Sequence, residues 1–146
     1  MKDLVIRVPN EPGALARVTA AISDAGVNLS AATCIGSGDA ADLHVLVKHV
    51  EATRRVLEPA GITVTEEREV VVVEAQDHAG VLADLARRVA DAGINLNMVY
   101  VATGTRIVFG ADDIEGLRDA LHIHDDMPDL ADLPSEDEVE IAGSRL

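Results

Sequence analysis

Residues 23–29 read SDAGVNL, and residues 90–96 read ADAGINL. The offset between them is 67 residues, and the same offset aligns PGALA at 12–16 with AGVLA at 79–83. Across 4–29 and 71–96, nine of 26 positions are identical, among them Gly13/Gly80, Gly26/Gly93 and Asn28/Asn95. Identity at a fixed offset, together with a shared apolar rhythm, indicates an internal repeat. The chain is therefore a tandem duplication, and its fold depends on what one copy forms.

Each copy predicts the same order of elements. A β-branched run at 3–8 or 69–75 reads as a strand, and a loop ending in glycine follows it. Apolar residues at helical spacing come next: Leu15, Val18, Ile22 and Ala25, then Leu82, Leu85, Val89 and Ala92. Gly26 and Gly93 stand where a left-handed residue commonly ends a helix. The pattern continues with strands at 27–35 and 94–102, return strands at 42–50 and 106–111, helices at 51–61 and 113–123, and a strand at 62–67.

This order predicts an α+β fold of two ferredoxin-like βαββαβ repeats, packed side by side with antiparallel sheets. The first repeat is expected at 1–67 and the second at 68–123, and we expect the two copies to join in one larger sheet. An acidic segment at 124–146 follows, in which EVEIA at 138–142 is the candidate for the last strand. The long linker before it leaves an acidic flap or a tail as alternatives.

Composition limits the classes of partner. The net charge of −14, with Tyr100 and Phe109 as the whole aromatic content, argues against nucleic acid. No run of 18 apolar residues predicts a membrane helix, and the N-terminus does not read as a secretory signal. Cys34 is the single cysteine, so no internal disulfide or multi-cysteine metal site is expected. We expect Cys34 to be at least half-buried in a strand and the protein to be cytoplasmic.

The stretch Asn10-Glu11-Pro12-Gly13-Ala14-Leu15, followed by Gly26-Val27-Asn28-Leu29, resembles the ACT domain. That family is a small βαββαβ module that binds amino acids and regulates biosynthetic enzymes. The second copy keeps Gly80, Leu82, Gly93 and Asn95 but has Asp77 in place of the asparagine and Ala79 in place of the proline. The resemblance covers roughly 4–121. It implies a stand-alone pair of ACT domains, a regulatory protein and not an enzyme.

The two bends before the helices are suited to an α-amino acid. Backbone N–H groups at a helix start attract a carboxylate, and a glycine lets the ligand approach the backbone. Asn10 carries donor and acceptor groups, and Asp77 can accept from an ammonium. Asn28 is expected to meet the bend of a neighbouring copy across an interface. The candidate ligand-binding residues are Asn10, Glu11, Pro12, Gly13, Ala14, Leu15, Asn28, Asp77, His78, Ala79, Gly80, Val81, Leu82 and Asn95.

Other interpretations stay open. Asn10 can equally be an ordinary helix cap. A ligand-free protein–protein interaction module would keep the duplicated scaffold without a site. An acylphosphatase-like hydrolase would need an arginine in the first bend, which contains the acid Glu11 instead. The expected partners are a free amino acid, a second copy in a homodimer, and a regulated enzyme or other protein. No catalytic residue, metal, cofactor or membrane is expected. Binding would act by allosteric regulation.

Overall fold

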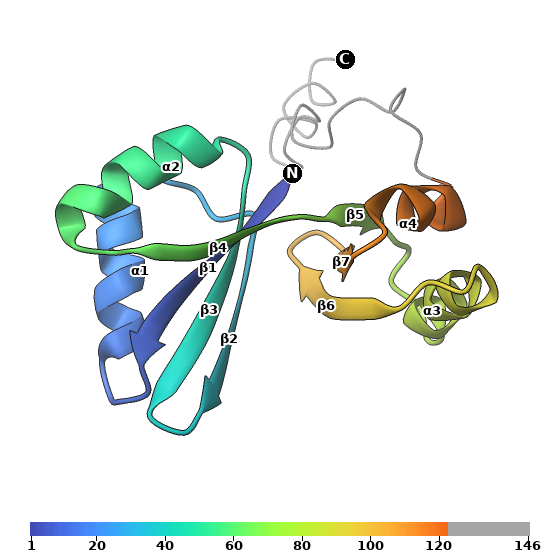
Figure 1. Cartoon of the computed structure of the whole chain (residues 1–146), viewed down its shortest axis with the longest axis horizontal. Coiled ribbons are helices and arrows are strands. Elements are labelled where there is room, and N and C mark those ends of the chain that lie inside the picture. The colour runs from blue at the N-terminus through green and yellow to red at the C-terminus, as the bar shows by residue number, and fades with distance from the viewer. Residues whose placement is uncertain (123–146) are drawn as a thin grey trace, which may run out of the picture.

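The computed structural model describes residues 1–122 (Figure 1). The first repeat comprises β1 (Lys2–Pro9), α1 (Ala14–Asp24), β2 (Ala31–Ser37), β3 (Ala40–Val47), α2 (Val50–Leu57), a 3-10 turn η1 (Glu58–Ala60) and β4 (Val64–Glu69). The second comprises β5 (Val71–Glu74), α3 (Val81–Asp91), β6 (Leu96–Ala102), β7 (Arg106–Ala111) and α4 (Ile114–Leu121). The predicted order of helices and strands is confirmed. The candidate strand at 138–142 and the acidic segment 124–146 lie outside the described residues.

The strands form two antiparallel sheets. One has the order β2-β3-β1-β4 and the other has the order β5-β7-β6. The expectation of one larger sheet is therefore wrong for the described part of the chain, where no strand of one sheet is hydrogen-bonded to the other. β4 continues past the expected boundary at residue 67 to Glu69, and Val70 alone separates it from β5. Figure 1 shows these two strands as a nearly straight connection between the repeats.

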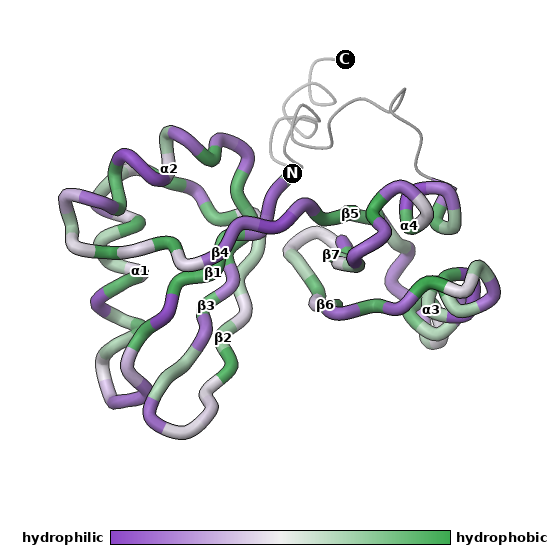
Figure 2. Tube along the Cα trace, in the orientation of Figure 1, coloured by the Kyte–Doolittle hydropathy of each residue, from purple (hydrophilic) through white to green (hydrophobic). Residues whose placement is uncertain are grey.

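Helices cover the outer face of each sheet, and the two remaining faces meet. One core joins α1 and α2 to β1 and β3, and a second joins α3 and α4 to β5 and β7. A third cluster lies between the sheets and consists of strand and junction residues: Ala31, Leu46, Val70, Tyr100, Ala102 and Val108. The layers therefore run helix, sheet, sheet, helix. Figure 2 shows the hydrophilic stretch along β4, which is an edge strand, in contrast to the hydrophobic residues of the inner strands.

The glycines of the duplicated stretches end the first helix of each repeat, as predicted. Gly26 and Gly93 have φ of 70° and 74°. Gly26 N–H donates to Ser23 O, and the next residue's N–H reaches back to Ile22 O. The second repeat makes the same pair of bonds, and together they satisfy the last carbonyls of both helices.

The predicted apolar stripe is only partly confirmed. Val18 and Ile22 in α1, and Leu85 and Val89 in α3, are buried. Leu15 and Leu82, in contrast, are 44% and 41% exposed. α1 begins at Ala14, and this alanine faces the core in place of the leucine that follows it. Each repeat thus presents one leucine to the surface directly after its bend.

A buried carboxylate connects the two sheets. Asp3 of β1 is 0% exposed. Its Oδ1 accepts a hydrogen bond from the Tyr100 hydroxyl of β6 at 2.7 Å, and its Oδ2 lies 2.8 Å from His44 Nδ1 of β3. The positions of Asp3 and His44 correspond to Val70 and Val108 in the second repeat, which also belong to the cluster between the sheets. The pair of polar residues, Asp3 and His44, is therefore present in the first repeat and replaced by two valines in the second.

The hydroxyl of Tyr100 makes stability dependent on pH at the alkaline end. Burial, followed by the hydrogen bond to Asp3, raises the pKa of Tyr100 above its ordinary value. A group with a raised folded-state pKa stabilises the fold below its unfolded pKa and loses that contribution as pH rises. We expect the stability difference between the wild type and Tyr100→Phe to shrink above about pH 10. Denaturant unfolding at several alkaline pH values measures it, and a difference that stays constant would contradict the assignment.

Candidate functional site

The first bend, residues 10–13, joins β1 to α1. Gly13 has φ +87°, in the left-handed region that glycine adopts without strain. Ala14 N–H donates to Glu11 O at 3.2 Å, and among residues 1–122 no side chain caps the start of α1. The N–H groups of Leu15 and Ala16 have no hydrogen-bond partner within that range. Two donors at the positive end of the helix dipole are therefore available to an anion.

Asn10 is not the cap of α1. Its Nδ2 donates to Gly38 O at 3.0 Å, and its backbone N–H donates to Asp39 O at 2.9 Å. A Cβ placed on Gly36 would lie 3.0 Å from Asn10 Nδ2, so the amide packs directly on that glycine. Asn10 thus fastens the first bend to the β2–β3 hairpin, and one donor of its side chain is already used.

A cation that the sequence reasoning missed lies beside this bend. Arg17 Nη2 is 2.8 Å from Glu11 Oε1, and Arg17 Nη1 is 3.5 Å from the position of a Cβ on Gly13. Both side chains are exposed. The signal was the spacing: Arg17 follows Gly13 by four residues, which is one helical turn, and so lies over the same face. The first bend thus presents backbone donors, a guanidinium and a carboxylate together.

The second bend, residues 77–80, joins β5 to α3 and is more open. Gly80 has φ +96°, no atom lies within 4 Å of its Cβ position, and no side chain of the described residues caps α3. Asp77, His78 and Ala79 are exposed, and His78 Nδ1 lies 3.1 Å from Ala79 O. The counterpart of Arg17 is Asp84, which pairs with Arg87 at 3.5 Å. The second bend is therefore the less favourable of the two for an anion.

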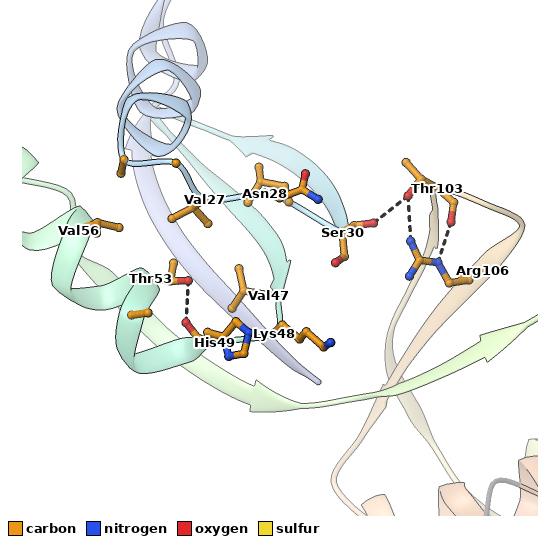
Figure 3. Close-up of a pocket in the computed structure, with 14 residues that line it drawn as sticks. Val27, Asn28, Ser30, Val47, Lys48, His49, Thr53, Val56, Thr103 and Arg106 are labelled. Carbon is orange, nitrogen blue, oxygen red and sulfur yellow. Dashed lines mark hydrogen bonds between the residues drawn. The ribbon is translucent and has the colours of Figure 1, made fainter. Parts of the chain in front are cut away.

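Asn28 lies in a pocket of about 790 Å³ and not beside the second bend. The pocket lies between the connection from α1 to β2, the start of α2, and the β6–β7 hairpin of the second repeat (Figure 3). Within the chain, Asn28 therefore shares a pocket with Thr103 and Arg106 of that hairpin. Asn95 is exposed between α3 and β6. Contact of Asn28 with a bend of another chain, and a ligand-binding role of Asn95, stay predictions.

In the described range 1–122, no group of three or more His, Cys, Asp or Glu side chains is placed to hold a metal ion. No helix in that range has both the length and the apolar character to cross a membrane. Cys34 is exposed on β2, contrary to the expectation of burial, because β2 is an edge strand.

Several solved structures have the same fold as this chain. The chain shares its fold with protein BT0572 from Bacteroides thetaiotaomicron, with a TM-score of 0.74 and 22% identity over 83% of this chain and 85% of that chain. It is also similar to the ligand-free regulatory subunit of aspartate kinase from Thermus thermophilus, with a TM-score of 0.62 and 23% identity over 83% and 89% of the two chains. The regulatory subunit of aspartate kinase from Thermus flavus gives 0.56 and 22% over the same shares.

No curated protein matches the sequence. The family model of the ACT domain matches residues 2–58 and again residues 70–125, which together make up most of the chain. The first stretch spans β1 to the start of η1, and the second begins directly before β5. The chain therefore belongs to the ACT domain family.

Proposed function

We propose that this protein is a non-catalytic regulatory module that binds a free amino acid at its two bends. One observation carries the proposal: the bend occurs twice, each time with a left-handed glycine, an exposed leucine and a helix start that no side chain of residues 1–122 caps. Membership of the ACT family supports it. Two of the similar structures are named regulatory subunits of aspartate kinase, which supports a regulatory role here as well.

The chemistry of the first bend suits the charged head of an α-amino acid. The ligand carboxylate would accept from the N–H groups of Leu15 and Ala16, with Arg17 adding charge. Its ammonium would lie on the side of Glu11, and an aliphatic side chain would contact Leu15. At the second bend Asp77 would replace Glu11 as the acceptor. Because that bend has no counterpart of Arg17, we expect it to bind more weakly.

Association into a homodimer fits the unprotected sheet edges. β2 and β6 are edge strands of the described sheets, and neither contains a charged residue. Ile35 in β2 is 62% exposed, and Val101 in β6 is 67% exposed. The edge strand β4, in contrast, reads VTEERE and carries charge at most positions. Charges on an edge prevent pairing with other chains, so β2 and β6 are better suited to a partner than β4 is. The same surfaces favour a ligand-free interaction module as the second candidate.

The test is a thermal-shift screen of the full chain against the twenty amino acids. Saturating ligand is expected to raise the melting temperature by about 5 °C for one or a few of them. Gly13→Ala with Gly80→Ala is expected to remove the shift, because a methyl group would lie where the carboxylate approaches. Gly26→Ala with Gly93→Ala is the matched control. It introduces the same backbone strain at positions with no atom within 4 Å, outside the bends.

The outcomes separate the candidates. A flat screen would contradict the amino-acid sensor and leave the interaction module. A shift that survives in the bend variant but not in the control would place the ligand elsewhere. A shift lost in the bend variant and kept in the control would support binding at the bends.

A further inference from the structure

The pocket between the repeats has a charge opposite to that of the chain. The net charge of the protein is −14, yet no aspartate or glutamate of the described residues lines this pocket. Lys48, directly after β3, and Arg106, at the start of β7, supply two cations, and His49 adds an imidazole. The opposite wall is apolar and includes Val27, Val47 and Val56 (Figure 3). Cations on one side and hydrocarbon on the other match an organic anion.

Hydrogen bonds hold the cation of the second repeat at the pocket. Arg106 Nε donates to Thr103 O at 2.8 Å, and Arg106 Nη2 donates to Thr103 Oγ1 at 3.0 Å. The same hydroxyl donates to Ser30 O of the first repeat at 3.1 Å. Figure 3 shows this chain of bonds along one wall, with the Lys48 side chain extending towards the same side. Groups of both repeats thus meet around one space, and the guanidinium is fixed there before any ligand arrives.

The internal repeat indicates what this space would accept. Aligning the starts of α2 and α4 places Lys48 and His49 on Asp112 and Asp113. Asp113 supplies a carboxylate to its own helix: Oδ1 accepts from Gly116 N–H at 2.9 Å. Among residues 1–122 no side chain does the same for α2. At the start of α4, the second repeat has a carboxylate of its own chain that accepts from the helix. At the start of α2, the first repeat has Lys48, His49 and the pocket.

We propose that this pocket is a second site, separate from the bends, that binds a small organic carboxylate. The carboxylate is bound by Lys48 and Arg106, and its hydrocarbon part packs on the valine wall. Because its cations come from different repeats, a bound anion links the two and stabilises their contact. The proposal goes beyond the amino-acid function and does not require it. The carboxylate has two possible sources, a free metabolite or the eight acidic residues of segment 124–146.

Calorimetric titration of the full chain with glutarate at low ionic strength tests the site. We expect saturable binding that weakens with added salt. Lys48→Met and Arg106→Met are each expected to weaken it about tenfold, and Lys48→Arg to retain it. Arg87→Met is the matched control, since it removes one exposed positive charge outside the pocket. The Gly13→Ala/Gly80→Ala variant is expected to bind glutarate as the wild type does, which separates this site from the bends.

A second full-length variant identifies the source of the carboxylate. It carries Glu136→Gln, Asp137→Asn, Glu138→Gln and Glu140→Gln. Binding of glutarate by this variant but not by the wild type supports the site with the acidic segment as its occupant. Equal binding by both supports a free ligand. Absence of binding by both at up to about 10 mM, or undiminished binding by Lys48→Met and Arg106→Met, would overturn the proposal.

Discussion

Tyr100→Phe is expected to lower the free energy of unfolding by about 2 kcal/mol, the range for a hydrogen bond to a charged group. The substitution keeps the ring that packs between the sheets and removes only the hydroxyl. Asp3, which is fully buried, then keeps His44 as its side-chain partner. Because a buried charge that loses a donor bears the whole desolvation cost, the effect should exceed that of an ordinary surface bond. Denaturant unfolding monitored by circular dichroism measures the difference.

The second repeat provides the control for this prediction. It holds Val70 and Val108 at the positions of Asp3 and His44. A variant with Asp3→Val, His44→Val and Tyr100→Phe makes both repeats apolar there, and we expect it to regain most of the lost stability. If the triple variant is much less stable than Tyr100→Phe, the desolvated charge is not the source of the cost. An unchanged stability of Tyr100→Phe itself would show that the hydroxyl contributes nothing.

Charging the sheet edges is expected to produce the largest change in assembly. Ile35→Lys and Val101→Lys each place an ammonium on an edge strand that is otherwise uncharged. A lysine there must be desolvated if another strand pairs with the edge, so we expect the variant at the interface to weaken dimerisation about a hundredfold. Sedimentation velocity over a range of protein concentrations measures the dissociation constant. The variant that acts also shows which edge is used.

Ala20→Lys, on the exposed side of α1, is the control for added positive charge. It should leave the dissociation constant unchanged. A wild-type protein that stays monomeric at every concentration would contradict pairing through these edges. So would a variant that carries both Ile35→Lys and Val101→Lys and still dimerises as the wild type does. The apolar edges would then need another partner, which is the case of the interaction module.

Local features of the fold were predictable because neighbouring residues specify them. Gly26 and Gly93 end helices since only a residue tolerant of positive φ fits there, and that requirement is visible in sequence. The β-branched runs at 3–8 and 69–75 indicate β1 and β5 for a similar reason, although only β1 is an inner strand of the described sheets. The sequence also indicates the bends, but Leu15, which fits the helical spacing of the apolar stripe, is 44% exposed. Helical spacing predicts which face of the helix a residue lies on. It does not predict how far along the helix the sheet still covers that face.

Contacts between the repeats could not be predicted. Asp3 and Tyr100 are separated by 97 residues, and nothing near either one indicates the other. The pocket likewise combines Lys48 with Arg106 through the packing of two sheets that the duplication leaves unspecified. Internal symmetry predicts two similar units, whereas the way in which they meet depends on the few positions at which they differ. Lys48 and His49, opposite Asp112 and Asp113, are such positions, and they are also where a new site is proposed.

The single residue between β4 and β5 has a mechanical consequence. A chain of two domains on a flexible linker can bind a ligand at one end while the other end tumbles freely. Here the connection is the single residue Val70, which is itself buried between the sheets, so the junction is not a flexible linker. We therefore expect a tilt of β4 to turn β5 with it, so that the two repeats move together. A displacement in one repeat is then expected to move the other repeat as well.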